Sequence, residues 1–227
     1  MMLSYEIEDS ELELVDVNPS VNARFDVFGK VIDIDHVYPL YSAFCRQEPL
    51  LHQIQGIGMT AITGSPTPQG LLKLTPDSHV IFRVLASQVP LIYPLSEQPV
   101  KLGKYEIEFG IPKIELLQPA SRLRSRMVII RGYKEPEAFL QAAKRQLNEL
   151  EIQGNLRILQ RSDGKFNRKT IKVREQTLIG FGAEVDGLSP EDSLILQQKG
   201  IGGKPKMGCG IFLPLPRKSR RSSSKIR

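Results

Sequence analysis

Cysteine, histidine and long apolar runs are scarce in this sequence, and each scarcity excludes a class of protein. The two cysteines, Cys45 and Cys209, lie far apart without CxxC or Cys/His spacing, so the sequence predicts neither a disulfide framework nor a zinc site. No stretch approaches the roughly 20 uncharged apolar residues that cross a bilayer, and the first residues are acidic where a secretory signal would be basic. We therefore expect a cytoplasmic protein that does not associate with membranes.

The formal net charge of +6 hides a separation of acidic and basic residues along the chain. Residues 1–20 carry six acidic side chains and no Lys or Arg, whereas residues 217–227 carry six basic side chains and no acid. Between residues 121 and 216, 17 basic residues stand against 10 acidic ones, a balance of +7. The tail suits a polyphosphate partner or simply aids solubility, and the balance of 121–216 predicts that this half binds an anionic ligand.

The first half of the chain reads as strand, helix, strand, strand, helix, strand. Residues 24–33 alternate apolar and polar side chains, which is typical of a strand. Residues 37–47 then place apolar side chains on one helical face, with Asp35 able to cap the helix and Pro49 preventing its continuation. The remaining segments are expected strands at 59–63, 79–85 and 105–111 and a short helical stretch at 88–98.

The same order returns in the second half. Residues 135–151 form an amphipathic helix that ends before Gly154, and residues 189–198 form another, with Ser189 as cap and Pro190 in its first turn. The expected strands are 126–133, 155–161, two within 169–188, and 207–213. Two βαββαβ units predict an α+β protein with two tandem ferredoxin-like domains. We assign 1–20 to an acidic segment, 21–118 and 119–216 to the two domains, and 217–227 to a disordered basic tail.

Residues 199–212 form the most distinctive segment, because five of their residues are glycines interleaved with lysines. It is not a Walker A loop, since Gln198 and Pro205 stand where that loop needs Gly and Ser or Thr, and Pro205 also breaks GxGxxG. Backbone N–H groups without a neighbouring Cβ can approach phosphate closely, although the segment could instead be a flexible connection into an edge strand. The residues expected to contact a polyphosphate are Lys199, Gly200, Gly202, Gly203, Lys204, Lys206 and Gly208.

This segment has the form GxGxxxxMGCGxF and lies just before the last strand of a double ferredoxin-like chain, and in both respects it resembles the CRISPR-associated protein 6 family. The resemblance covers nearly the whole chain and includes FGKVIDIDHVYPLYSAFCRQEPLLHQIQG at 28–56. It implies an endoribonuclease that binds a CRISPR repeat hairpin and cuts once at its base, leaving a 5′-hydroxyl and a 2′,3′-cyclic phosphate. It also implies partnership with other CRISPR-associated effector subunits, and neither a metal ion nor a small-molecule cofactor.

In such a reaction a 2′-hydroxyl attacks the adjacent phosphorus, which requires proton transfer and cations near the phosphorane. Histidine suits the proton transfer because its pKa lies near neutrality. The resemblance points to His52, with His36 as the alternative, since the helix dipole would lower its pKa and favour the proton-accepting form. A helix over 36–47 would be about 17 Å long and would put the two histidines at its opposite ends, so we expect them to be alternatives. We expect His79 to be a surface or sheet-edge residue.

Supporting roles fall to residues of the same helix. Tyr38 and Tyr41 could orient the 2′-hydroxyl or the phosphate, or could simply pack in the core. Arg46 could neutralise the phosphorane or remain solvated.

For RNA binding, the expected hairpin at 161–174 carries six cations in fourteen residues and one aromatic ring. This composition suits contacts with the phosphates of a stem, although charged runs are often no more than solvated faces. The residues concerned are Arg161, Lys165, Phe166, Arg168, Lys169, Lys172 and Arg174. Two rival hypotheses remain open: a non-catalytic RNA-binding subunit, and a ferredoxin-like scaffold for protein assembly.

Overall fold

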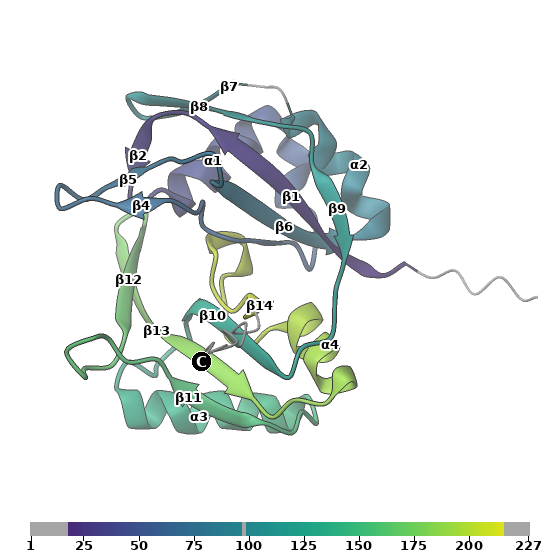
Figure 1. Ribbon diagram of the computed structural model, residues 1–227, viewed down its shortest axis with the longest axis vertical. Coiled ribbons are helices and arrows are strands. Elements are labelled where there is room, and N and C mark those ends of the chain that lie inside the picture. The colour runs from purple at the N-terminus through teal and green to yellow at the C-terminus, as the bar shows by residue number, and fades with distance from the viewer. Residues whose placement is uncertain (1–17, 97–98, 216–227) are drawn as a thin grey trace, which may run out of the picture.

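The structure is a computed structural model that describes residues 18–96 and 99–215 (Figure 1). The acidic residues 1–17 and the basic tail 217–227 lie outside the described residues. Two antiparallel sheets, each with its own helices, are stacked one above the other in Figure 1. No helix within these described ranges has the length and apolar character needed to cross a bilayer.

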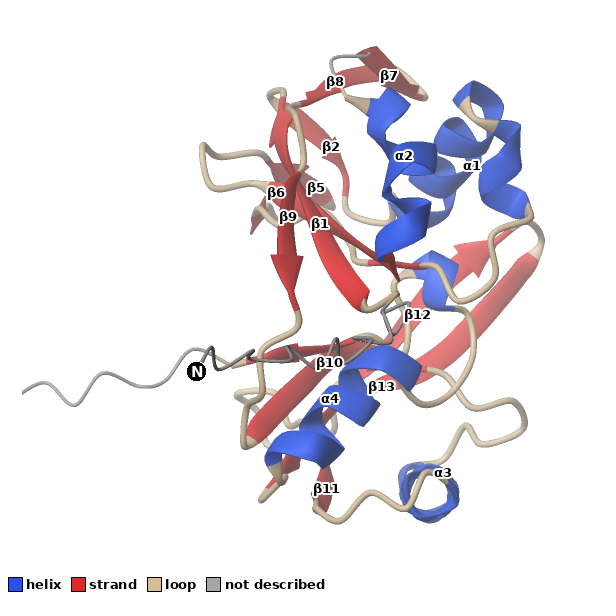
Figure 2. Cartoon of the chain, turned by 90° about the vertical axis from the view of Figure 1, so that its right-hand side faces the viewer, coloured by secondary structure: helices blue, strands red, loops and turns tan. Residues whose placement is uncertain are grey.

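The first unit has the strand order of a ferredoxin-like fold. Strand β1 (Ser20–Phe28) lies between β6 (His79–Leu85) and a bent last strand made of β8 (Tyr105–Phe109) and β9 (Lys113–Leu116). Beyond them, β3 (Gly58–Met59) pairs with β6, and β7 (Pro99–Leu102) pairs with β8. Figure 2 shows α1 (Val37–Gln47) and α2 (Val89–Ile92) together on one side of this sheet.

Aromatic side chains fill the core between this sheet and its helices. Alternate residues of β1 point toward the helices, and among them Phe25 is fully buried. Its ring meets Phe82 at a centroid distance of 5.6 Å, and Phe44 of α1 meets Phe109 at 5.0 Å. Such packed aromatic contacts stabilise beyond the area they bury, and they fix α1 on the sheet.

The second unit repeats the topology. Its sheet order is β11 (Asn155–Ile158), β13 (Gln176–Asp186), β10 (Arg122–Val128) and β14 (Phe212–Pro214). The helices are α3 (Pro136–Glu149) and α4 (Pro190–Lys199). Phe139 of α3 and Leu196 of α4 share one core with Phe181 of β13. The prediction of two tandem ferredoxin-like units in an α+β chain is confirmed.

One hairpin leaves this regular arrangement and reaches the first unit. Strand β12 (Arg168–Val173) pairs with the first half of β13, whereas β11 pairs with the second half. In Figures 1 and 2 the hairpin β12–β13 extends from the second unit to the first, and its tip lies beneath α1 in Figure 2. The backbone N–H of Lys172 donates to the carboxylate of Asp35 over 3.2 Å, which ties the hairpin to the chain just before α1.

Several predicted elements differ from the structure. Asp35 does not cap α1: His36 occupies the N-cap position and no side chain there accepts a cap hydrogen bond, because the Asp35 carboxylate is turned to Lys172. The strand predicted at 126–133 runs instead from Arg122 to Val128. A small sheet of β2 (Val31–Asp33), β4 (Ser65–Pro66) and β5 (Leu71–Lys73) was not predicted, and neither were β7 and β9.

The glycine-rich segment is a tight connection rather than a strand. The expected strand 207–213 begins only at Phe212, and a 3-10 turn over Pro205–Met207 precedes it. A Cβ at Gly200 would collide with the carbonyl of Gly210, and one at Gly202 with the carbonyl of Ile129, so both positions require glycine. The segment lies between the two units (Figure 1), with Gly210 donating to Met127 of β10 over 2.8 Å.

A buried arginine joins the two units. Arg83 of β6 is 4% exposed, and its Nε donates to Asn22 in its own sheet over 3.0 Å. Its Nη1 crosses to the second unit and donates to the carbonyls of Gln197 (2.6 Å) and Phe212 (2.9 Å). Burial lowers the pKa of Arg83 to about 10, so the guanidinium stays charged at neutral pH while it holds α4 and β14 against the first sheet.

Candidate active site

A pocket of about 660 Å³ brings together three segments that are distant in the sequence. One face of α1 contributes Tyr38, Tyr41 and Ser42, and the 3-10 helix that follows α1, Pro49–His52, contributes His52. The tip of the β12–β13 hairpin and the 3-10 turn of the glycine-rich segment form the other walls. The residues from these two segments are Val173, Arg174, Glu175, Gln176, Lys204, Lys206 and Met207.

His52 is the histidine of this pocket. Its side chain is exposed, and its ring stands edge-on to Tyr41 with the centroids 5.6 Å apart. Among the described residues, neither ring nitrogen of His52 has a hydrogen-bond partner. Both ring nitrogens are therefore available to a ligand in the pocket.

Lys206 brings a cation to the same pocket. Its ammonium group donates to the backbone carbonyls of His52 (2.9 Å) and Leu51 (3.4 Å) and lies 5.9 Å from the centre of the Tyr41 ring. These contacts fix the lysine on the segment that carries the histidine. No carboxylate of the described residues pairs with this ammonium group, so its positive charge remains available to an anion in the pocket.

Tyr41 supports the pocket, while Tyr38 lines it. The buried Tyr41 hydroxyl donates to the Leu51 carbonyl over 3.3 Å, and burial together with the neighbouring Cys45 raises the pKa of this phenol. The phenol therefore stays protonated and holds the 3-10 helix of His52 against α1. Tyr38 is half-buried in the pocket wall, which leaves its hydroxyl as a possible contact for a ligand.

Arg46 and His36, two of the residues considered for chemistry, lie outside the pocket. Arg46 is exposed and donates to Ser42 over 3.1 Å, one turn back along α1. His36 is only 3% exposed, and its Nε2 accepts the backbone N–H of Ile62 over 2.9 Å. Its Nδ1 must then carry the proton, and it donates to the Asp33 carbonyl over 3.0 Å.

The environment of His36 keeps its ring neutral. Its pKa is lowered to about 4, chiefly because burial penalises the charged imidazolium. The helix dipole expected from the sequence is therefore not the main cause. We interpret His36 as a structural residue that joins the start of α1 to the backbone of Ile62, just after β3.

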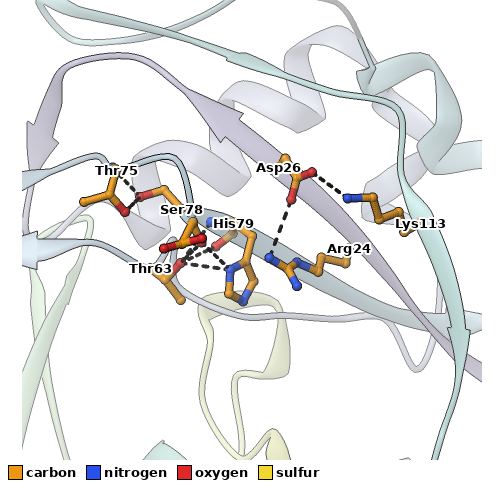
Figure 3. Close-up of polar contacts among 8 residues, drawn as sticks. Arg24, Asp26, Thr63, Thr75, Ser78, His79 and Lys113 are labelled. Atoms are coloured by element: carbon orange, nitrogen blue, oxygen red, sulfur yellow. Dashed lines mark hydrogen bonds and ion pairs between the residues drawn. The ribbon is translucent and has the colours of Figure 1, made fainter.

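His79 belongs to a separate polar cluster on the first sheet (Figure 3). Its Nδ1 lies 2.8 Å from the Asp77 carbonyl and 3.1 Å from the Thr63 hydroxyl. Asp26, its partner across β1 and β6, is bonded to Lys113 over 3.0 Å. Hydrogen bonding to Lys113 lowers the pKa of the Asp26 carboxyl despite some burial.

Backbone strain marks the pocket as unusual. Only three non-glycine residues of 18–96 and 99–215 have a positive φ: Glu151 (59°), Arg174 (53°) and Lys204 (69°). Two of the three, Arg174 and Lys204, line the pocket as cations. A side chain in this left-handed region costs of order 1 to 2 kcal/mol, and strain of this kind is concentrated at functional sites.

Within the glycine-rich segment, Lys204 and Lys206 line the pocket of His52, whereas Lys199 and the glycines do not. The N–H groups of Gly200, Gly202, Gly203, Gly208 and Gly210 all donate to groups of the protein, so they do not form a free cradle for phosphate. Lys199 and Gly200 line a different hollow, at the seam beside Arg83. The segment therefore offers cations to two separate places.

The residues predicted to bind RNA at 161–174 also lie in several places. Arg174 lies in the pocket, whereas Arg161, Lys165 and Phe166 lie in the loop before β12. Along β12, Arg168 and Lys172 are exposed, and Lys169 is half-buried on the opposite face, where burial and then the charge of Arg126 lower its pKa. In the part of the chain that the structure describes, no three His, Cys, Asp or Glu side chains converge as metal ligands would.

Sequence reasoning missed Ser42, Glu175 and Gln176. Ser42 lies four residues after Tyr38 and thus on the same helical face, so helical spacing could have found it. Glu175 and Gln176 come to the pocket only through the tertiary contact of the hairpin with α1, for which the local sequence carries no signal.

The topology defines the class first: two tandem ferredoxin-like units joined by a glycine-rich segment. A family model described as "Cas6 Crispr" matches residues 21–217. The curated "CRISPR-associated endonuclease Cas6" of Myxococcus xanthus (strain DK1622) is 32% identical over 203 residues, covering 89% of this chain and 85% of the relative. The chain belongs to the Cas6 family.

Solved structures agree in fold. The structure titled "Characterization of a Cas6-related gene from Pyrococcus furiosus" has a TM-score of 0.59 at 16% identity, covering 89% of this chain and 100% of the other. "An RAMP protein binding different RNA substrates" has a TM-score of 0.61 at 14% identity, with coverage of 87% and 99%. At these identities the likeness concerns the fold alone.

Proposed function

We propose that this protein is an endoribonuclease that binds the hairpin of a CRISPR repeat and cuts the precursor RNA once, at the base of the stem. The observation that carries the proposal is the convergence of His52, Arg174 and Lys206 in one pocket, although these residues lie 32 to 154 positions apart in the sequence. The curated Myxococcus relative is named a CRISPR-associated endonuclease, which supports the same reaction class.

The pocket can perform an intramolecular transesterification. In the proposed reaction His52 removes the proton from a ribose 2′-hydroxyl, and the resulting oxygen forms a bond to the adjacent phosphorus. The bond from phosphorus to the 5′-oxygen breaks, and the imidazolium of His52 returns its proton to that oxygen. The products are a 2′,3′-cyclic phosphate and a 5′-hydroxyl.

Cations would stabilise the charge that develops on the phosphorane. Lys206 is anchored beside His52 by two carbonyls, and an ammonium group held in place before the reaction stabilises developing charge without reorganising. Tyr38 is the residue proposed to orient the ribose or the phosphate. Because histidine and lysine supply both the proton transfer and the charge, the proposed steps need no metal ion.

RNA would be held by the hairpin and the lysines around the pocket. Arg168 and Lys172 share the exposed face of β12, and Arg174 and Lys204 stand at the pocket. A line of cations leading to the reacting phosphate suits the backbone of a stem whose base lies at His52. In this proposal the lysines of residues 199–208 contact RNA, and the glycines of that segment shape the path of the chain.

The test is cleavage of the repeat RNA transcribed from the host's own array, in the presence of EDTA. A single product ending in a cyclic phosphate supports the proposal, whereas tight binding with intact RNA supports the alternative of a non-catalytic RNA-binding subunit. His52→Ala should abolish cutting and leave the dissociation constant almost unchanged. Normal cutting by this variant would refute the role given to His52.

We further propose, as the family resemblance implies, that the protein acts in the cytoplasm, keeps its product stem bound and joins other CRISPR-associated effector subunits. Affinity purification of the tagged protein from its host tests this. Recovery of the mature guide RNA with additional subunits is the expected result, and recovery of the protein without RNA would contradict it.

A further inference from the structure

A further hollow, of about 550 Å³, lies at the outer edge of the second sheet, where β11 meets the start of α3. Its base is apolar, with Leu140, Leu156 and Ile158, and the exposed ring of Phe166 contributes to its wall. Gln160 and Glu137 are its polar residues that can meet the edge of a planar ligand. An apolar hollow with an aromatic wall and a few polar groups is the usual form of a site for a flat, partly polar molecule.

The loop that carries Phe166 is fixed, although its ring is 40% exposed. Gln160 and Phe166 form an isolated β-bridge, and Arg161 donates from its backbone to Lys165 over 2.8 Å. At the base of the loop, Asn167 bonds to Leu159 over 2.7 Å and accepts from Gly182 of β13 over 3.0 Å. The phenylalanine is therefore presented to solvent by a closed hairpin loop.

A pinned arginine lies beside the hollow. Arg157 of β11 contributes to its lining. Because Arg157 alternates with the buried Leu156 and Ile158, its guanidinium lies on the sheet face opposite α3, where it is hydrogen-bonded to the fully buried carboxylate of Glu184. Arg124 binds the same carboxylate through two nitrogens, at 2.7 and 3.1 Å. The Arg122 guanidinium lies 3.6 Å from this carboxylate, so one buried carboxylate has three half-exposed guanidinium groups around it, which leaves positive charge for a phosphate at this edge of the sheet.

We propose that this hollow binds one unpaired nucleotide of the repeat RNA, with its base stacked on Phe166 and its phosphate near Arg157. The inference rests on the proposed function and adds to it a binding site remote from the cut. Eight residues of extended chain separate Phe166 from Arg174 of the catalytic pocket, about 26 Å at 3.3 Å per residue. A base held at that distance would help to select the correct RNA and its register.

The test combines two changes at the same contact. Each unpaired position of the repeat RNA is replaced in turn by an abasic nucleotide, and the dissociation constant is measured for wild type and for Phe166→Ala. One abasic position should weaken wild-type binding by about 5- to 100-fold, the effect of losing one stacked base. The same abasic RNA should bind Phe166→Ala no more weakly than unmodified RNA binds that variant.

Phe166→Tyr should keep the aromatic wall and restore binding, and Phe28→Ala, at another exposed phenylalanine in the first unit, should leave it unchanged. The melting temperature of each variant checks its folding. The site is refuted if no abasic position loses its effect in Phe166→Ala while the wild type still cuts the RNA. Failure of the wild type to bind or cut repeat RNA would instead overturn the proposed function.

Discussion

At the scale of single residues, His36 and His52 lie at the two ends of one helical region but in opposite environments. His36 is buried with both ring nitrogens bonded, whereas His52 is exposed in a pocket beside an anchored lysine. The same side chain thus serves structure in one place and suits proton transfer in the other. Helical position alone could not separate these roles, because Ile62, which donates its backbone N–H to His36, lies 26 residues away in the sequence.

The burial of His36 predicts a pH dependence of stability. Its pKa in the folded protein is about 4, against about 6.5 when unfolded, so the unfolded state binds the extra proton between these values. The stabilisation is complete above pH 6.5 and is lost as the pH falls toward 4, by about 3 kcal/mol in total. Urea unfolding of wild type and His36→Asn from pH 7 to 4 should show that this loss is absent in the variant. Equal slopes in both proteins would contradict the assignment.

Lys206 lies in the pocket of His52 and Lys199 in the hollow at the seam beside Arg83, so we predict different roles for these two lysines. Lys206→Met should lower the cleavage rate by about 100- to 1,000-fold, because it removes the cation placed beside the phosphorane. Lys199→Met, in the separate hollow at the seam, should change the rate by less than about fivefold and weaken affinity only slightly. Single-turnover rates at saturating protein distinguish these outcomes, and equal losses of rate would refute the separation.

At the scale of elements, the hairpin β12–β13 completes the pocket at the expense of local strain. Arg174 adopts a left-handed conformation at the turn between Val173 and Gln176, which a residue without a Cβ adopts freely. Both strands of the hairpin were predicted from the sequence, within residues 169–188. Its contact with Asp35 and α1 did not, because residues 137 positions apart in sequence meet there.

Relieving the strain at Arg174 should raise the stability of the protein and lower its cleavage activity. Arg174→Gly should raise the free energy of unfolding by up to about 1 kcal/mol, yet reduce cleavage because the cation is lost. Glu151→Gly is the matched control, since Glu151 also has a positive φ but lies at the end of α3, outside the pocket. The control should gain similar stability and cut normally. A loss of activity in both variants would argue against a role specific to Arg174.

At the scale of the whole molecule, the repeated order of strands and helices made the fold predictable, since each unit follows its own local pattern. The arrangement between the units was not predictable, because it depends on Arg83, a buried charge in the middle of an ordinary strand pattern. Six of the eleven residues that line the pocket are among those predicted from the sequence: Tyr38, Tyr41, His52, Arg174, Lys204 and Lys206. Other predicted residues lie elsewhere: the packing of the glycine-rich segment between the units places Lys199 and Gly200 at the seam, and the loop before β12 places Phe166 at the edge of the second sheet.

Arg83 should therefore make the two units unfold together. Arg83→Ala removes two charged hydrogen bonds between the units, and we expect a loss of about 3 to 5 kcal/mol and a broader transition in urea. Lys113→Ala, which removes an exposed pair with Asp26, should cost less than about 1 kcal/mol. An unchanged transition in Arg83→Ala would show that the units are held together by other contacts.

The central claim is that the RNA supplies its own nucleophile in the pocket of His52 and Lys206. The most direct measurement compares the repeat RNA with an identical RNA that carries a single 2′-deoxyribose on the 5′ side of the scissile phosphate. The wild-type protein should bind both with the same dissociation constant and cut only the all-ribose RNA. Cutting of the deoxy-substituted RNA at that phosphate would contradict the account.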